Sequence, residues 1–417
     1  MVNELKASPT YQHLRVTKEE LIEQHRKYLG QHDFDIPEDQ LDIPGLYWSA
    51  KMHKTPPKQR FIAASHRCTT KVVSKFLCNV LQLIENQHRR LCSKIHERTG
   101  VNRMWIINNS KATLDHMKKL NERNQAEGPQ TYDFTTLYTN IPHDQLKKQM
   151  AWVVQKAFDG GPCAWIFVGR YETHWARSSS KKQGCMFVDA PTVINHINWL
   201  VDNIFVSCGG RIYKQVIGIP MGTDCATFLA NLFLYALEYD YLKQLTQVNL
   251  FEARKFSHIQ RYIDDLNALR YGAVFAQHKD RLYPPELTLN QTTVSTTSTH
   301  FLDLTITAEH KQYVSKIYDK HDDYKFAIVN FPHLDANIPK KPAYGVFISQ
   351  VLRYFSGCTH YADFADRVRT LQLRLSTQGY RKSGLLRAVD SLMERRGNII
   401  FHKWKVRLAE FIADCIK

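Results

Sequence analysis

The sequence RYIDDLNAL, residues 261–269, places Asp264 and Asp265 side by side within an apolar run. Packing would favour neither carboxylate between Ile263 and Leu266, and adjacent aspartates usually occupy a solvated turn or a helix cap. The pattern predicts two short strands with the aspartates at the bend. A tight hairpin of this kind would display both side chains at its tip.

A third carboxylate lies in TYDFTTLYTNIPHDQLKKQM, residues 131–150, which predicts a strand, a turn and a helix, with Asp133 near the strand end. If this strand lay beside the hairpin, three carboxylates would repel one another unless cations lay among them. Carboxylate oxygens suit Mg²⁺, and two such ions stabilise the attacking and leaving oxygens of an in-line phosphoryl transfer. Asp133, Asp264 and Asp265 are therefore the candidate metal ligands.

The charge distribution indicates a polyanionic partner. The 417 residues include 56 Lys and Arg against 40 Asp and Glu, for a net charge of +16. Residues 1–43 carry a net charge of −4, whereas residues 44–100 and 338–417 each carry +9. Two basic blocks around a nearly neutral centre suit a nucleic-acid channel, and charge on exposed helices is the alternative interpretation.

A basic hairpin and a glycine turn supply further candidate residues. LYWSAKMHKTPPKQRFIAAS, residues 46–65, predicts two strands joined at a proline pair. Its Lys51, Lys54 and Arg60 could bind the phosphates of a nucleoside triphosphate. For Lys51 and Lys58, protection of an exposed edge strand from aggregation is the alternative. In GIPMG, Gly218 and Gly222 leave the backbone open to the close approach of a base pair or sugar.

Local patterns predict the remaining elements. Helices are expected from Thr70, over 191–204 and from about 226 to 242, and a hairpin is expected at the glycine pair 209–210. The segment 159–190 has the glycine, serine and lysine content of an inserted surface loop. The last 80 residues predict a basic bundle with three apolar stripes, which are Phe364, Val368, Leu371 and Leu375; Leu385, Leu386, Val389 and Leu392; and Phe401, Trp404, Leu408 and Phe411.

The order of these motifs, from the basic hairpin through DFTTLY, QVIGIPMG, YIDD and FLDL to the basic bundle, resembles the right-hand polymerase of reverse transcriptases over residues 44–417. WIINNS (105–110), TYDFTTLYTNIPH (131–143), YDKHDDYKF (318–326) and PAYGVFISQVLRY (342–354) are similar to the Penelope-like retroelement enzymes, which are relatives of telomerase. The resemblance implies an α+β fold with an N-terminal extension (1–43), fingers (44–130), a palm (131–320) with fingers elements, and an α-helical thumb (321–417).

The same resemblance implies RNA-directed DNA synthesis, in which two Mg²⁺ ions, with Mn²⁺ as an alternative, are held by Asp133, Asp264 and Asp265. Expected partners are an RNA template, a DNA primer and dNTPs. Tyr138 would lie under the sugar and reject a 2′-hydroxyl, although core packing beside Leu137 is the alternative. The further implied contacts to nucleotide or nucleic acid are Gln215, Gly218, Gly222, Tyr262, Lys316 and Arg353.

Three features depart from this family pattern. LTLNQTT, residues 287–293, offers no lysine as a general acid, no paired GIY and YIG nuclease signatures occur, and 159–190 has no counterpart. An RNA-dependent RNA polymerase and a catalytically silent nucleic-acid-binding protein therefore remain alternatives. Oligomeric state stays open.

Cellular location is expected to be intracellular. Nine cysteines lack any CxxC pair, which argues against a disulfide framework and a structural zinc cluster. The longest apolar stretch is shorter than the roughly 20 residues of a membrane helix. Nuclear residence is the expectation that the retroelement resemblance adds.

Overall fold

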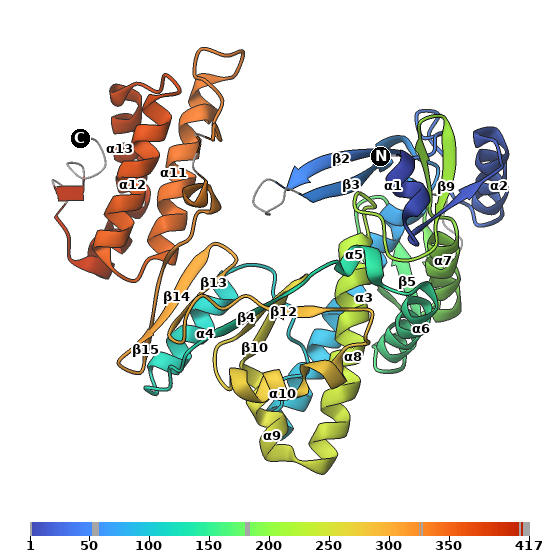
Figure 1. Ribbon diagram of the computed structural model, residues 1–417, viewed down its shortest axis with the longest axis horizontal. Helices are drawn as coiled ribbons and strands as arrows, with labels where there is room; N and C mark the ends of the chain where they lie inside the picture. The colour runs from blue at the N-terminus through green and yellow to red at the C-terminus, as the bar shows by residue number, and fades with distance from the viewer. Residues whose placement is uncertain are drawn as a thin grey trace. The chain divides into compact units, whose positions relative to one another are not determined.

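The computed structural model describes residues 2–51, 58–179, 184–324, 326, 328–407 and 410–411. It divides into two compact units, each assembled from separate stretches of chain (Figure 1). Unit 1 comprises Met1–Ile106, Asp133–Asp264 and Ala273–Asn290, and unit 2 comprises Ile107–Tyr132, Asp265–Gly272 and Gln291–Lys417. None of the helices in the described ranges is long and apolar enough to cross a membrane.

A five-stranded sheet in unit 1 has the order β1-β9-β8-β2-β3. The strands are β1 (Tyr11–Leu14), β2 (Gly45–Lys51), β3 (Lys58–Ala64), β8 (Phe205–Cys208) and β9 (Arg211–Gln215). The predicted basic hairpin is confirmed as β2 and β3, which pair antiparallel from Gly45↔Ala64 to Lys51↔Lys58. The outer strand β1 comes from the N-terminal extension and pairs antiparallel with β9.

Helices of very different lengths supply much of the buried core of unit 1. They are α1 (Val2–Ala7), α2 (Lys18–Gln31), α3 (Lys71–Thr99), α5 (Leu137–Asn140), α6 (His143–Asp159), α7 (Ala190–Asp202), α8 (Ala226–Val248), α9 (Leu250–Lys255) and α10 (Gly272–Leu282). The predictions for α3, α7 and α8 are confirmed. The first part of helix α8, residues 226–239, is buried around most of its circumference because α3 and α6 both pack on the helix, which explains the mainly apolar sequence of this part.

A second sheet has the order β10-β11-β4-β12. Its strands are β4 (Gln130–Phe134), β10 (Ile259–Tyr262), β11 (Asp265–Ala268) and β12 (Leu289–Gln291). The predicted bend in RYIDDLNAL is therefore confirmed, and the turn consists of Ile263 and Asp264.

The segment 159–190, expected to be a surface loop, contains a three-stranded antiparallel sheet of order β6-β5-β7. The strands are β5 (Trp165–Val168), β6 (Thr173–Ala176) and β7 (Met186–Val188). The apolar run of β5 is buried and packs on α3, and Trp175 contacts Phe158 edge to face with ring centroids 4.9 Å apart. The polar cluster that suggested a loop spans residues 177–184, of which 180–183 lie outside the described residues, and the apolar residues of the short strands supply the packing.

Unit 2 combines a three-stranded sheet with a helical bundle (Figure 1). The elements are β13 (Ser298–Phe301), β14 (Leu304–Glu309), β15 (Gln312–Ile317), α4 (Lys111–Asn121), α11 (Lys340–Gly357), α12 (Tyr361–Ser376) and α13 (Lys382–Trp404). Helices α11 and α12 both pack on β15, and α11 also packs on α12 and α13.

The bundle has the predicted helical character but different boundaries. The first apolar stripe is confirmed as the buried face of α12, and the second lies on α13. The prediction of a third helix that carries the third stripe was wrong for Phe401 and Trp404, because both belong to α13, which continues to Trp404. Leu408 lies outside the described residues. Gly397 lies between the second and third stripes. Its lower helix propensity costs about 1 kcal/mol of helix stability, which is not enough to end α13 there.

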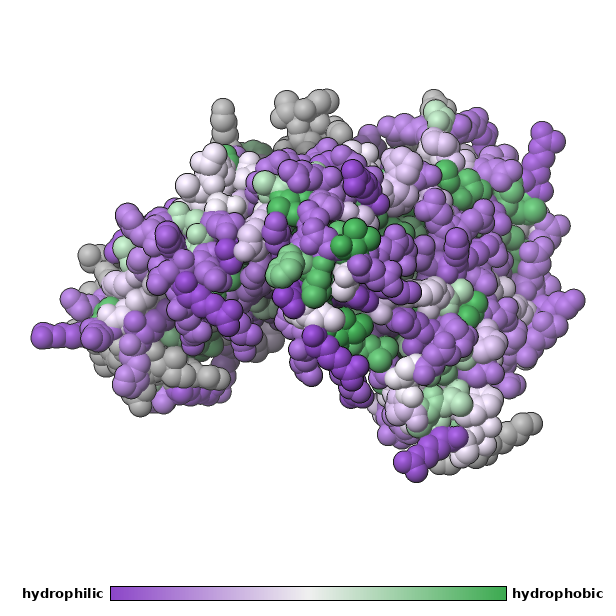
Figure 2. All heavy atoms as spheres, turned by 90° about the horizontal axis from the view of Figure 1, so that it is seen from below, coloured by the Kyte–Doolittle hydropathy of each residue, from purple (hydrophilic) through white to green (hydrophobic). Residues whose placement is uncertain are grey.

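The face of the molecule seen in Figure 2 is mainly polar. Figure 2 shows hydrophilic residues over most of the face in view, with apolar residues in small separate groups. Single exposed aromatic residues such as Tyr171, which is 88% exposed, are consistent with this pattern.

Three buried histidines in unit 1 make its stability depend on pH. Burial lowers the pKa of His25, His88 and His196 to about 4 from 6.5. The unfolded chain therefore binds protons that the folded chain does not between pH 6.5 and 4. The stability that these groups contribute is complete above pH 6.5 and is lost as the pH falls toward 4.

We expect the free energy of unfolding to decrease between pH 7 and pH 5 by up to about 1.4 kcal/mol per pH unit for each histidine. Urea titrations at several pH values would measure this slope. His88→Gln should make it shallower, whereas the exposed His66→Gln should not. A slope unchanged by His88→Gln would contradict the assignment.

Candidate active site

The hairpin of β10 and β11 presents Asp264 in a strained turn. Ile263 has φ of 55°, a left-handed conformation that is a genuine outlier for a β-branched residue. Asp264 follows it in the turn, Asp265 is the first residue of β11, and both carboxylates are partly exposed. Strain of this kind persists only where surrounding contacts fix the backbone, and it concentrates at functional sites.

A buried ion pair supplies that fixation. The Arg261 guanidinium donates to both carboxylate oxygens of Glu238 on α8, at 2.6 and 3.1 Å, and both side chains are fully buried. Arg261 also donates to the side-chain and backbone oxygens of Asn231, at 2.8 and 3.1 Å. A further bond of 3.1 Å to the carbonyl oxygen of Ile263 holds the strained residue itself. The turn is thereby attached to α8.

Strand β4 brings Asp133 beside this turn. The backbone N–H of Phe134 donates to the carbonyl oxygen of Asp264 at 3.2 Å, so Asp133 is one residue from a direct contact with the hairpin. Thr135 N–H donates to the carbonyl oxygen of Thr288 at 3.1 Å, which fixes the chain just beyond the strand. Two of the predicted carboxylates therefore come from neighbouring segments of unit 1.

The donor atoms fit a hard divalent cation, because carboxylate oxygens are the ligands that Mg²⁺ prefers. The side chains themselves are not arranged as a complete metal site. Within the described residues, which include all three aspartates, no group of three or more His, Cys, Asp or Glu side chains is placed to hold a metal ion. The chemistry of the donors and the Phe134–Asp264 contact therefore carry the metal hypothesis.

Tyr138 lies close enough to the turn of Ile263 and Asp264 for the charge of Asp264 to act on its hydroxyl. Burial raises the pKa of its hydroxyl, as does the nearby charge of Asp264, whereas a hydrogen bond with Thr227 and the charge of Arg60 lower it. Tyr262 is a further neighbour. The structure thus brings the predicted residues Arg60, Tyr138, Tyr262 and Asp264 into one region of unit 1.

The GIPMG loop is interlocked with the segment after Asp133. Gly218 N–H donates to the carbonyl oxygen of Ile141 at 2.8 Å, and Ile219 N–H donates to that of Tyr138 at 2.6 Å. Gly218 has φ of 84°, and a Cβ atom there would lie 2.3 Å from the Tyr138 carbonyl oxygen. Glycine is therefore required at this position by both conformation and space.

The other end of the loop is attached to the hairpin of β2 and β3. Ala63 N–H donates to the carbonyl oxygen of Met221 at 2.8 Å, and the Ser65 hydroxyl donates to that of Gly222. Gly222 has φ of 119°, and a Cβ atom there would lie 2.1 Å from the Ala63 carbonyl oxygen. Asp224 pairs with Lys71 of α3 at 3.0 Å.

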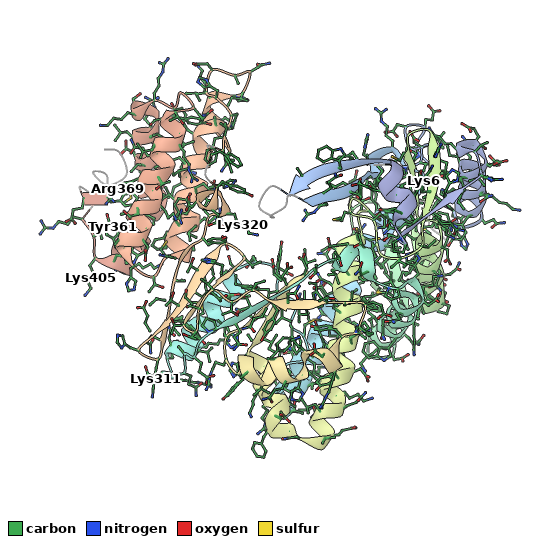
Figure 3. All side chains as sticks on the ribbon, viewed as in Figure 1. Lys6, Lys311, Lys320, Tyr361, Arg369 and Lys405 are labelled. Carbon is green, nitrogen blue, oxygen red and sulfur yellow. The ribbon has the colours of Figure 1, made fainter. Side chains whose placement is uncertain are left out.

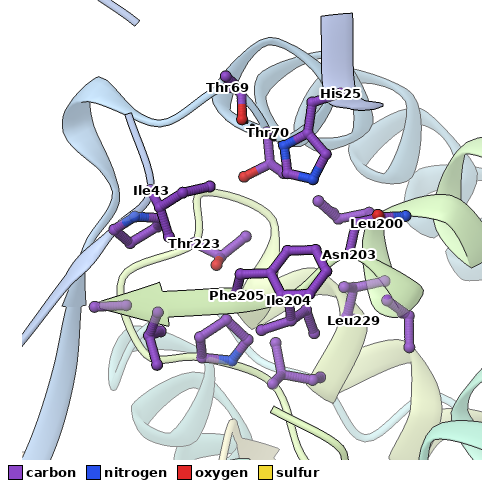
Figure 4. Close-up of a pocket in the computed structure, with 16 residues that line it drawn as sticks. His25, Ile43, Thr69, Thr70, Leu200, Asn203, Ile204, Phe205, Thr223 and Leu229 are labelled. Carbon is purple, nitrogen blue, oxygen red and sulfur yellow. Dashed lines mark hydrogen bonds between the residues drawn. The ribbon is translucent and has the colours of Figure 1, made fainter. Parts of the chain in front are cut away.

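A small cavity of about 20 Å³ lies behind this loop, with room for one water molecule (Figure 4). Thr223 and Pro220 of the loop line it together with His25 and Ile43 of the N-terminal extension. The extension therefore packs directly behind the glycine loop.

Other predicted residues occupy different environments. Gln215 is only 1% exposed, and its Nε2 donates to the carbonyl oxygen of Ile217 at 2.9 Å. Lys54 lies outside the described residues, and the Lys51 side chain is likewise outside them. In unit 2, Lys316 is exposed on β15, and Arg353 of α11 donates to Asp303 at 2.8 Å.

The fold of the chain is similar to that of solved polymerase structures. The chain is similar to telomerase from Candida albicans in complex with a TWJ fragment of telomeric RNA, with a TM-score of 0.55 and 11% identity over 100% of this chain and 71% of that one. The chain has a right-hand polymerase fold. Apo telomerase from Candida tropicalis gives a TM-score of 0.47 and 10% identity over 99% of this chain and 70% of that one. No protein-family model and no curated protein matches the sequence.

Sequence reasoning missed Arg261, Glu238 and Asn231, although one signal was available. Arg261 immediately precedes YIDD in a strand where the residues two positions away, Ile259 and Ile263, are apolar, and a buried guanidinium requires a partner. Glu238 is the first charged residue after the mainly apolar run 226–237 of α8, and it would need the same explanation. His143, whose Nε2–H donates to the Gly218 carbonyl oxygen at 2.7 Å, was also missed.

We expect Glu238→Gln to lower the free energy of unfolding by about 3–5 kcal/mol, because it leaves the Arg261 guanidinium buried without its counter-charge. Urea denaturation would measure the change. Asp280→Asn is the control, because it removes an 84% exposed carboxylate and should change stability by less than about 0.5 kcal/mol. A loss below 1 kcal/mol for Glu238→Gln would contradict the proposed anchoring.

A matched pair of glycine substitutions tests the interlocked loop. Gly218 and Gly210 both have positive φ, 84° and 71°, but nothing lies within 4 Å of a Cβ at Gly210. Gly210→Ala should therefore cost only the conformational strain of about 1–2 kcal/mol, and Gly218→Ala should cost distinctly more. Thermal or urea unfolding of the two variants measures the difference, and equal losses would show that the close approach to Tyr138 is unimportant.

Proposed function

We propose that the chain is an RNA-directed DNA polymerase that extends a primer on an RNA template by two-metal-ion nucleotidyl transfer. The observation that carries the proposal is the hydrogen bond from Phe134 to Asp264, because it places the strand of Asp133 against the YIDD turn. The right-hand polymerase fold supports the same reaction class. We also propose that the chain belongs with the Penelope-like enzymes, on the sequence motifs alone.

In this proposal Asp133, Asp264 and Asp265 hold two Mg²⁺ ions. When bound, the ions would activate the primer 3′-hydroxyl and stabilise the charge that develops on the leaving pyrophosphate. The strained turn holds the Asp264 carboxylate at the tip of a rigid hairpin, so that little reorganisation is needed. Arg60 supplies a planar cation suited to a triphosphate oxygen.

Nucleotide choice is assigned to Tyr138. Its ring lies near Asp264 and Tyr262, and its backbone is fixed by the bond from Ile219. In this proposal the ring lies under the sugar of the incoming nucleotide, where it collides with a 2′-hydroxyl. This favours DNA synthesis over the alternative of an RNA-dependent RNA polymerase.

The test is primer extension by the purified chain on RNA and DNA templates in parallel, with dNTPs or NTPs. We expect Mg²⁺-dependent extension of a DNA primer on RNA with dNTPs. Asp264→Asn should reduce extension to the level seen with EDTA. Asp240→Asn, which alters an exposed aspartate on α8, should leave extension unchanged.

Two results would overturn the proposal in different ways. A strong preference for NTPs, unaffected by Tyr138→Ala, would indicate an RNA polymerase. Nucleic-acid binding that persists in EDTA without any synthesis under any metal would indicate a catalytically silent binding protein.

A further inference from the structure

A groove between α11 and α13 in unit 2 carries an unusual excess of positive charge. It has a volume of about 620 Å³. We call it the α11–α13 groove and define it by its cations, which are Lys340, Lys341, Arg381, Arg387 and Arg395. Asp335 is the only carboxylate that lines it among the described residues.

These cations differ from the other basic residues of the bundle. Arg353 is paired with Asp303 at 2.8 Å, Arg374 with Asp319 at 2.6 Å, and Arg367 with Asp322. The five groove cations are exposed, and none of them forms an ion pair with any described residue. Their charge is therefore available to a ligand.

The spacing of the cations excludes a compact ligand. Arg387 and Arg395 are eight residues apart on α13, a rise of about 12 Å, and Arg381 precedes Arg387 by a further six residues. A single phosphate or a small polyphosphate cannot contact cations distributed over about 20 Å of helix. An extended polyanion can.

The walls of the groove add an aromatic surface. Tyr344 of α11 crosses close to α13, since a Cβ on Gly384 would lie 2.1 Å from its ring, and its hydroxyl accepts from the Arg381 N–H at 3.0 Å. Ile348 and Ala388 line the groove beside it. A line of cations along an aromatic and apolar wall is the combination that binds the backbone and bases of single-stranded nucleic acid.

We propose that the α11–α13 groove binds a single-stranded segment of nucleic acid. The bases of a single strand are free to contact Tyr344 and Ile348, whereas the bases of a duplex are already stacked and paired. An acidic peptide would match the charge but would gain less from the tyrosine ring. The proposal adds a binding site to the proposed polymerase, and its test measures binding alone, so each can fail separately.

The experiment is fluorescence anisotropy of the full chain with a labelled single-stranded RNA of about 12 nucleotides and a hairpin duplex of equal charge. The groove variant is Arg387→Glu with Arg395→Glu. The control is Arg123→Glu with Lys311→Glu, which makes the same charge change at exposed sites of unit 2 away from the bundle; Lys311 lies at the turn between β14 and β15 (Figure 3). Circular dichroism confirms that both variants fold.

We expect the groove variant to bind the single strand at least about tenfold more weakly than the control does. The salt slope, which is the slope of log affinity against log salt concentration, should become shallower by about 1.4, since each of the two lost phosphate contacts contributes about 0.7. Asp335→Asn should strengthen binding, because it removes the carboxylate that opposes the ligand. Tyr344→Leu should weaken binding of the single strand without changing its salt slope.

Three results would overturn the proposal. Equal affinities of the groove and control variants would remove the groove from the binding surface. An equal or larger loss for the hairpin duplex would assign the groove to double-stranded nucleic acid. Equally tight and equally variant-sensitive binding of a poly-glutamate peptide would show that the groove recognises charge alone.

Discussion

The buried ion pair of Arg261 and Glu238 is the constraint on which the candidate active site depends. Removing two charges from water is costly, and their mutual bonds, those from Arg261 to Asn231 and Ile263, and the one from the Tyr283 hydroxyl to Glu238 offset that cost. A buried ion pair often stabilises a protein no more than hydrophobic residues of the same volume would. The role of this pair is therefore better explained by the position in which it holds the turn than by its contribution to stability. It fixes the carbonyl of Ile263 and with it the direction in which the following aspartate leaves the hairpin.

The glycine loop is a second constraint, and it links segments that are far apart in sequence. One end of the loop is bonded to the chain around Tyr138, and the other end to the edge of β3. A displacement of the β2–β3 hairpin would therefore be transmitted through two backbone hydrogen bonds to the residues beside Asp264. Both contacts require positions without a Cβ, which explains the spacing of Gly218 and Gly222.

Much of this architecture follows from local sequence. The strands around YIDD, the hairpin 45–64 and helices α3, α7 and α8 follow from periodicity and turn residues, because each buries a face that the pattern identifies. The sheet within 159–190 could not be predicted, since its short strands gain their stability by packing on α3, a contact that the local sequence does not reveal. The partners of Arg261 were also inaccessible, because they are 23 and 30 residues away and only the fold brings them together.

The N-terminal extension closes one side of the five-stranded sheet. Because β1 pairs with β9 from Tyr11↔Gln215 to Leu14↔Ile212, the backbone groups of β9 are satisfied on both sides. A shortened chain beginning at Pro44 would leave β9 as an open edge with unpaired N–H and C=O groups, which is a template for self-association. The extension thus covers the edge of β9, and its removal would expose that edge to pairing with another copy of the chain.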